Sequence, residues 1–159
     1  QGEQAPPKLF TLQLHDVPRT VPTFTFSDRD ANPVQLTSFA GRFEVLNLWA
    51  TWCTPCIKEL PALDRLQKTL GGPDFMVLAL SLDRGGLLDV NSFWIRTGLS
   101  DLDIYLDPTM SVGQTLSARG LPTTLLVNRD GMEIARLEGP VEWDSAEAID
   151  YFRALTANH

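Results

Sequence analysis

The most constraining feature of this sequence is a buried-strand pattern that leads, through two cysteines, into an amphipathic helix. Residues 44–49 are almost continuously apolar, which predicts a central strand buried on both faces. From Cys53 to Leu70, apolar side chains recur at spacings of three and four, which predicts a helix. Pro61 inside this helix predicts a kink, and Gly71-Gly72-Pro73 predicts its end. We therefore expect Cys53 at the N-terminus of a helix that follows a buried strand.

The remaining patterns predict strands and helices in alternation. We expect a hairpin from short strands at 24–26 and 34–36, further strands at 75–82, 104–106, 123–128 and 132–137, and helices at 87–97, 107–119 and 144–157. Residues 1–22 contain four prolines and are interpreted as an extended lead-in, and residues 23–159 as one domain. This order predicts an α/β fold, a three-layer αβα arrangement with a mixed sheet.

Composition bounds the class of protein. The chain has 159 residues, of which 43% are apolar and 21% charged, as is typical of one globular domain. A formal net charge of −7, without a Lys or Arg cluster, argues against nucleic acid as a partner. No apolar run reaches the ~20 residues that span a bilayer, and residues 1–8 do not resemble a signal peptide. Because the chain begins with Gln rather than Met, we expect that a signal or anchor has been removed.

The two cysteines stand three positions apart and favour a redox pair. They are too few for a disulfide framework or, without a nearby His, for a structural zinc site. At a helix N-terminus the pKa of Cys53 is expected to fall, which makes its thiolate the nucleophile, and Cys56 can then resolve a mixed disulfide. Pro55 is tolerated in the first helical turn, and Trp52 is expected to cover the sulfurs partly. A stray motif or a static disulfide is the alternative.

Several motifs resemble one known family. The segment Leu46-Asn-Leu-Trp-Ala-Thr-Trp-Cys-Thr-Pro-Cys56, followed by Glu59-Leu-Pro61, is similar to the thioredoxin-like TlpA/ResA/CcmG family of bacterial extracytoplasmic thiol–disulfide oxidoreductases. A second signature is matched by Gly120-Leu-Pro-Thr-Thr124 with Asn128-Arg-Asp-Gly131, and the segment from Glu138 to Trp143 leans towards TlpA. The resemblance covers about residues 21–155. It implies a thioredoxin fold with an N-terminal β-hairpin and an inserted helix and strand at 87–106.

The resemblance also implies a function. It implies a protein-disulfide reductase without cofactor or metal, whose clients are extracytoplasmic proteins of the cytochrome c or copper-oxidase assembly type. It implies an upstream membrane thiol reductant, a monomer, and a location in the bacterial periplasm or at the outer face of the cytoplasmic membrane. It further implies a cis bond between Leu121 and Pro122 beside the cysteines, where the Leu121 backbone can pair with an extended substrate segment. An ordinary turn proline is the alternative.

Glu59 is the candidate acid–base group. It follows Cys56 by three residues, on the same helical face, and ResA-like members carry a functional Glu at this place. Burial beside the sulfurs would raise the pKa of Glu59 and let it shuttle the Cys56 proton. An exposed Glu favoured by the helix dipole is the alternative. Asn47 stands where thioredoxin has a buried Asp, and we expect only a hydrogen-bonded core residue there.

Other residues are given structural interpretations. His15 and His159 are expected to be exposed in the terminal segments, and Trp94 and Trp143 are expected to serve packing. Two other functions remain open. A thiol peroxidase of this fold would need Thr or Ser three residues before the reactive cysteine, where this chain has Ala50. A copper-binding module suits a thiolate pair, but copper chaperones of this fold resemble CxxxC proteins with a partner His.

Overall fold

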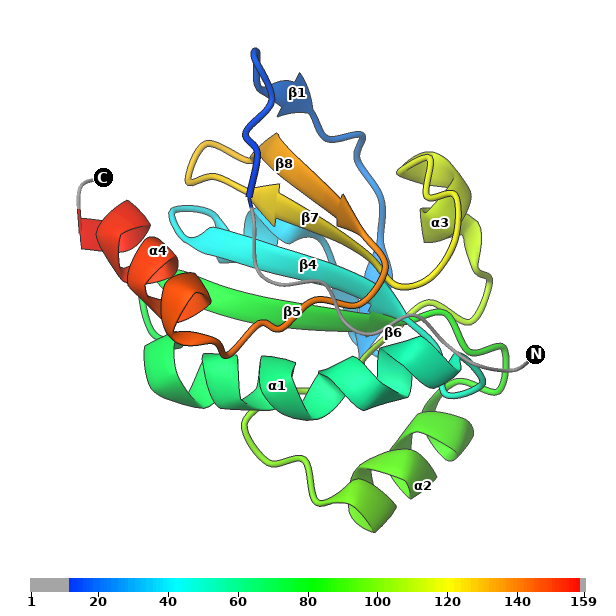
Figure 1. Cartoon of the computed structure of the whole chain (residues 1–159). Helices are drawn as coiled ribbons and strands as arrows, with labels where there is room; N and C mark the ends of the chain where they lie inside the picture. The colour runs from blue at the N-terminus through cyan, green and yellow to red at the C-terminus, as the bar shows by residue number, and fades with distance from the viewer. Residues whose placement is uncertain (1–11, 158–159) are drawn as a thin grey trace.

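A single eight-stranded mixed sheet organises the computed structural model, which describes residues 12–157 (Figure 1). Its strand order is β1-β8-β7-β4-β5-β6-β2-β3. The strands are β1 (Arg19–Thr20), β2 (Phe26–Asp28), β3 (Pro33–Val34), β4 (Phe43–Trp49), β5 (Phe75–Ser81), β6 (Tyr105–Leu106), β7 (Thr123–Val127) and β8 (Met132–Glu138). Central β4 pairs in parallel with β5 and antiparallel with β7. The predicted mixed sheet is confirmed.

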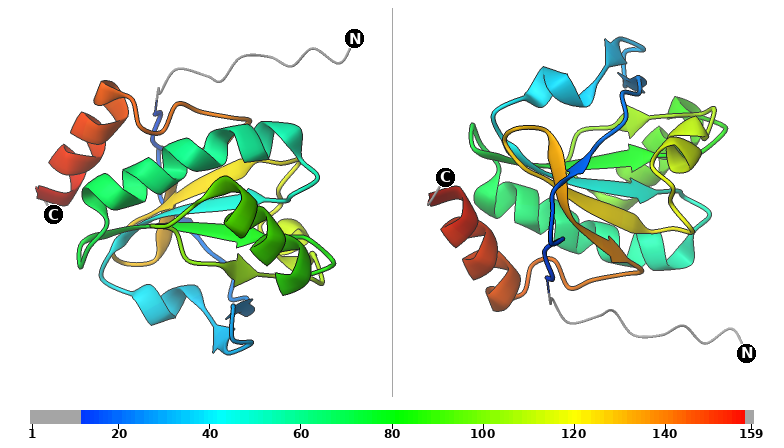
Figure 2. Two further views of the ribbon diagram at one scale, coloured as in Figure 1. Left: turned by 90° about the horizontal axis from the view of Figure 1, so that it is seen from below. Right: turned by 90° about the horizontal axis from the view of Figure 1, so that it is seen from above.

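Helices cover both faces of this sheet. On one face lie α1 (Thr54–Leu70), α2 (Leu87–Thr97) and α4 (Ala146–Ala157), whose apolar side chains share one buried cluster (Figure 2). The other face is covered by α3 (Ser111–Thr115) and the 3-10 helix η1 (Leu36–Phe39), which share a second cluster. Successive β4 side chains alternate between the two clusters, with Val45 in the first and Leu46 in the second. The predicted three-layer αβα thioredoxin fold is confirmed.

The predicted elements around the cysteines are confirmed closely. Strand β4 is buried at all seven positions, and α1 begins directly after Cys53 and ends at Leu70. Pro61 lies inside α1 and does not end it. Helix α2 has the predicted bounds, and Gly98 ends it in the left-handed conformation, with φ of 72°. Residues close together in the sequence define these elements, so apolar periodicity and capping residues are enough to predict them.

The helix predicted over 107–119 is too long. Only Ser111–Thr115 is α-helical, because residues on both sides adopt left-handed backbone conformations. These residues are Met110, with φ of 62°, and Ser117, with φ of 56°. The carboxylate of Asp107 also accepts hydrogen bonds from the Val112 amide at 2.9 Å and the Thr109 hydroxyl at 2.6 Å. A turn organised by Asp107 therefore replaces most of the expected helix.

The predicted N-terminal hairpin forms with shifted strands. β2 pairs with β3, but both lie nearer the turn than expected, and Leu36, the last residue of the expected second strand, is the first residue of η1. The Asp28 side chain accepts hydrogen bonds from the amides of Asp30 and Asn32, which closes the turn. Side-chain turn chemistry, which the apolar alternation did not reveal, sets the strand ends.

The described part of the N-terminal segment packs on the sheet. β1 pairs antiparallel with β8, and the His15 amide donates to the Ile134 carbonyl at 2.8 Å. The His15 side chain lies 2.8 Å from Glu133 and is only 13% exposed. The expectation of an exposed His15 is therefore wrong, because a buried carboxylate of β8 pairs with it. His159 and residues 1–11 lie outside the described residues, and the division at residue 22 stays a prediction. Between residues 12 and 157, none of the helices is both long and apolar enough to cross a bilayer.

Candidate functional site

The cysteine pair lies where β4 passes into α1. Cys53 is the N-cap residue of α1, and its Cα atom lies 5.2 Å from that of Cys56, to which it is joined by a disulfide. The Cys56 amide donates to the Cys53 sulfur at 3.3 Å. Pro55 occupies the first helical turn, as predicted, where its missing N–H leaves no carbonyl unpaired. The first turn of the helix therefore directs a free N–H group at the Cys53 sulfur.

The two sulfurs differ in access. Cys53 is 7% exposed and Cys56 is fully buried, whereas the neighbouring Trp52 is 63% exposed. The turn before Cys53 is held by Asp83, whose carboxylate accepts from the Thr51 amide at 3.0 Å and from the Thr51 hydroxyl at 2.6 Å. A substrate disulfide can therefore approach Cys53 more readily than Cys56.

The loop before β7 meets the cysteine end of β4. The Leu121–Pro122 bond is cis, as the resemblance implies, so the ordinary turn proline is excluded. Strand register places Leu48 opposite Thr123, so Pro122 lies level with the last residue of β4. The Pro122 carbonyl accepts from the Gly139 amide at 2.9 Å, which fixes the loop to the end of β8. Leu121 and Trp52 line one groove of about 440 Å³.

Glu59 is buried beside the pair, at 3% exposure, so the alternative of an exposed glutamate is wrong. Its Oε1 accepts from Asn47 Nδ2 at 3.0 Å, and its Oε2 accepts from the Val141 amide at 2.9 Å and from Trp143 Nε1 at 2.7 Å. Burial raises the pKa of Glu59 from 4.5 to about 7, although the three donors favour the ionised form and oppose that rise. The carboxyl group is thus held rigidly and can change protonation near neutral pH.

Two residues of this site, Asn47 and Trp143, make hydrogen bonds to Glu59 that the sequence did not predict. Asn47 is a hydrogen-bonded core residue, as expected, but it donates both to Glu59 and to Thr124 Oγ1, the latter at 2.9 Å. Trp143, expected only to pack, is 1% exposed and donates to Glu59. The sequence contained one indication of this role, because the indole N–H of a buried tryptophan usually donates to an acceptor. The sequence could not indicate which acceptor.

The comparisons with known proteins agree with this geometry. The Redoxin family model matches residues 17–152. The chain belongs to the Redoxin family. This Redoxin-family protein is 26% identical over 141 residues to the thiol-disulfide oxidoreductase ResA of Bacillus thuringiensis subsp. konkukian, which covers 89% of this chain and 79% of that protein.

This Redoxin-family protein shares its fold with other proteins of known structure. A protein of Chlorobium tepidum assigned as the thiol:disulfide interchange protein DsbE has a TM-score of 0.77 at 23% identity, covering 89% of this chain and 98% of that one. The exposed lipoprotein thioredoxin Etrx1 of Streptococcus pneumoniae has a TM-score of 0.68 at 22% identity, covering 87% and 100%. The predicted resemblance is confirmed, and the protein is a thiol–disulfide oxidoreductase with a cysteine pair at disulfide distance. The leaning towards TlpA stays a prediction.

One observation in the structure bears on each of the two alternative functions. Ala50, in the position where a peroxidase would carry a hydroxyl group, is fully buried and has a methyl side chain. Within residues 12–157, the structure brings together no group of three or more His, Cys, Asp or Glu side chains fit to hold a metal ion. The cysteine pair at disulfide distance and the similarity to ResA support thiol–disulfide exchange.

Proposed function

We propose that this protein reduces disulfides of extracytoplasmic client proteins, with Cys53 as the nucleophile and Cys56 as the resolving thiol. The observation that carries this proposal is the position of Cys53, which caps α1 and exposes more of its surface than Cys56. A thiolate at Cys53 would accept the Cys56 amide hydrogen and face the positive end of the helix dipole.

The proposed reaction has two exchange steps. The Cys53 thiolate attacks one sulfur of the client disulfide, and the second client sulfur leaves as a thiolate and takes up a proton. Cys56 then loses its proton and attacks the Cys53 sulfur, so the client departs as a dithiol and Cys53–Cys56 becomes a disulfide. Two electrons have passed to the client, and an upstream membrane thiol reductant must restore the dithiol.

Glu59 is proposed as the acceptor of the Cys56 proton. Cys56 and Glu59 lie three residues apart on α1 and are both buried. A pKa of about 7 leaves Glu59 able to take up and release a proton near neutral pH. The carboxyl group is fixed by three donors, so it would not need to reorganise between the two states.

The groove beside the pair is proposed to receive the client chain. Trp52 and Leu121 both line it, and Leu121 precedes the cis bond at the start of β7. An extended client segment could pair with the Leu121 backbone, while Trp52 and Pro55 shape access to Cys53. We further propose that the protein acts as a monomer, in the periplasm or at the outer face of the cytoplasmic membrane, held there by an anchor outside this chain. The relative described as an exposed lipoprotein supports that location.

The reduction potential tests the direction of electron flow. The protein is equilibrated in thiol redox buffers, and free thiols are trapped and counted. A potential below about −230 mV is expected for a dedicated reductase. A potential above about −180 mV would assign the protein to the oxidants or isomerases.

Single-cysteine variants test the assigned roles. Cys53→Ser is expected to abolish reduction of a protein disulfide, and Cys56→Ser to accumulate a mixed disulfide through Cys53. Equal trapping by both variants would contradict the assignment. Two assays on the reduced wild-type protein separate the alternatives. Fast peroxide consumption would support the peroxidase function, and stoichiometric Cu(I) retention would support the copper-binding function.

A further inference from the structure

A second buried carboxylate lies far from the redox pair. Glu44 is the second residue of β4, five residues before Trp49, which corresponds to roughly 17 Å of strand. Its side chain lies on the same face of the strand as those of Leu46 and Leu48, which belong to the cluster beneath η1 and α3. Glu44 is 2% exposed, and its Oε1 has no hydrogen-bond partner. A carboxylate oxygen without a donor is an unusual occupant of such a position.

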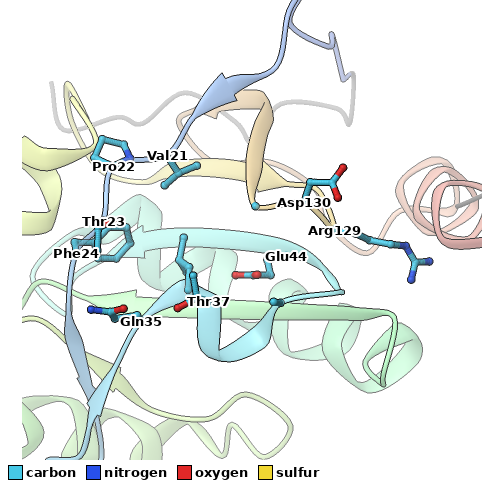
Figure 3. Close-up of a pocket in the computed structure, with 12 residues that line it drawn as sticks. Val21, Pro22, Thr23, Phe24, Gln35, Thr37, Glu44, Arg129 and Asp130 are labelled. Carbon is cyan, nitrogen blue, oxygen red and sulfur yellow. The ribbon is translucent and has the colours of Figure 1, made fainter.

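Glu44 opens into a cavity of about 150 Å³. Figure 3 shows the cavity bounded by the segment before β2, by η1 and by the turn between β7 and β8. The carboxylate points towards Gln35 and Thr37 at its centre (Figure 3). The walls are largely apolar and include Val21, Phe24, Leu36 and Ala40. The site therefore combines a hydrocarbon lining with one aimed, unsatisfied acceptor.

The charged side chains around the cavity do not neutralise Glu44. Arg129 donates to Asp74 at 3.0 Å and to the Thr156 carbonyl at 3.0 Å, and its guanidinium lies 5.2 Å from the Phe43 ring centre. Figure 3 shows the same guanidinium directed away from Glu44. Arg42 acts on Glu44 only through its charge, and Asp130 adds a further negative group at the rim. Among the described residues, Glu44 has no ion-pair partner.

We propose that this cavity is a binding site for a small alkylammonium molecule, whose N–H group donates to Glu44 Oε1 and whose hydrocarbon part contacts the apolar walls. An ammonium group supplies both the missing donor and the missing positive charge, and such charge-assisted hydrogen bonds are the strong ones. A cavity of about this size can hold roughly six heavy atoms. The net charge of −7 favours the approach of a cation.

The protonation state of Glu44 gives the site a recognisable signature. Burial raises the pKa of Glu44 from 4.5 to about 8, opposed in part by the charge of Arg42. The empty site therefore holds mostly the neutral acid at pH 6.5. An ammonium ligand favours the carboxylate, so its binding should release close to one proton from Glu44 at that pH.

Titration of the whole oxidised protein with n-butylammonium chloride tests the proposal. In amide NMR spectra we expect saturable shifts at Val21, Phe24, Thr37, Glu44 and Gly131, which surround the cavity. n-Butanol, which lacks the charge, and tetramethylammonium, which lacks the N–H group, are each expected to bind at least tenfold more weakly. Equal binding of n-butanol, or no saturable shift with n-butylammonium, would overturn the assignment.

Two variants make the test specific to Glu44. Glu44→Gln keeps the size of the side chain and should weaken n-butylammonium binding at least tenfold. Glu147→Gln, which removes the same charge from the exposed surface of α4, should leave binding within twofold. Calorimetry in buffers of different ionisation enthalpy should show the released proton, and binding without proton release would contradict the proposal. Both variants should reduce disulfides as the wild type does, so this result is independent of the proposed function.

Discussion

The two buried glutamates of this protein differ in what surrounds them. Glu59 accepts three hydrogen bonds from two separate segments of the chain, whereas Glu44 Oε1 has no hydrogen-bond partner among the described residues. Burial raises both pKa values, to about 7 for Glu59 and to about 8 for Glu44. The donors account for the difference, because hydrogen bonds to a carboxylate favour its ionised form. A carboxyl group with its donors in place is positioned for one reaction, whereas one without donors is available to a ligand.

The largest contrast is expected in stability. Glu59→Leu leaves three buried N–H groups without this acceptor, and each such group costs about 1–3 kcal/mol, so we expect a loss of stability of roughly 3–9 kcal/mol. Glu44→Leu removes a buried group that has no partner, so we expect stability at pH 8 to rise by about 1 kcal/mol or more. Urea denaturation measures both free energies of unfolding. A destabilised Glu44→Leu variant would show that Glu44 has a stabilising partner.

The next contrast is expected in activity. Glu59→Gln keeps an acceptor but removes the proton-transfer group, so we expect reduction of a protein disulfide to slow by about 100-fold. Because Glu59 must be ionised to accept the proton, the wild-type rate should rise through about pH 7, and this rise should be absent in Glu59→Gln. Glu44→Gln is the matched control and should keep the rate within twofold. An unchanged pH–rate profile in Glu59→Gln would remove Glu59 from the proton-transfer step.

The pH dependence of stability should separate the two groups further. A carboxyl whose pKa is raised in the folded state binds more protons folded than unfolded, so stability is greatest below about pH 4.5 and falls as pH rises through the folded pKa. For Glu44 this decrease continues to about pH 8, past the midpoint for Glu59. Between pH 6 and pH 8, the free energy of unfolding of Glu44→Gln should therefore fall by about 2 kcal/mol less than that of the wild type. Parallel stability curves for the two proteins would contradict the proposed burial cost at Glu44.

The smallest effect concerns one donor of the Glu59 site. The 2.7 Å hydrogen bond from Trp143 lowers the pKa of Glu59. Trp143→Phe removes this bond, so the midpoint of the pH–rate profile should move to higher pH. The rate well above that midpoint should change by less than about threefold, because Trp143 positions Glu59 and contacts no reacting atom. Trp94→Phe is the control, since the Trp94 indole donates to the Leu102 carbonyl and not to Glu59. Equal shifts in both variants would indicate a general packing effect.

Prediction from sequence succeeded where neighbours in the chain decide the structure. The strand before Cys53, the helix after it and the bounds of α2 follow from apolar periodicity and from a glycine that ends a helix. It was less accurate where side chains organise turns, as Asp107 does before the short α3 and Asp28 does in the hairpin. Periodicity carries no information about these bonds.

The sequence by itself determined that a cysteine pair caps a helix after a buried strand in a thioredoxin fold. Only the tertiary structure decided the state of the glutamates. The donors of Glu59 at Val141 and Trp143 lie 82 and 84 residues away along the chain, so no local pattern could reveal them. His15 likewise pairs with Glu133 across 118 residues. Protonation depends on burial and on neighbours in space, and folding alone brings those neighbours together.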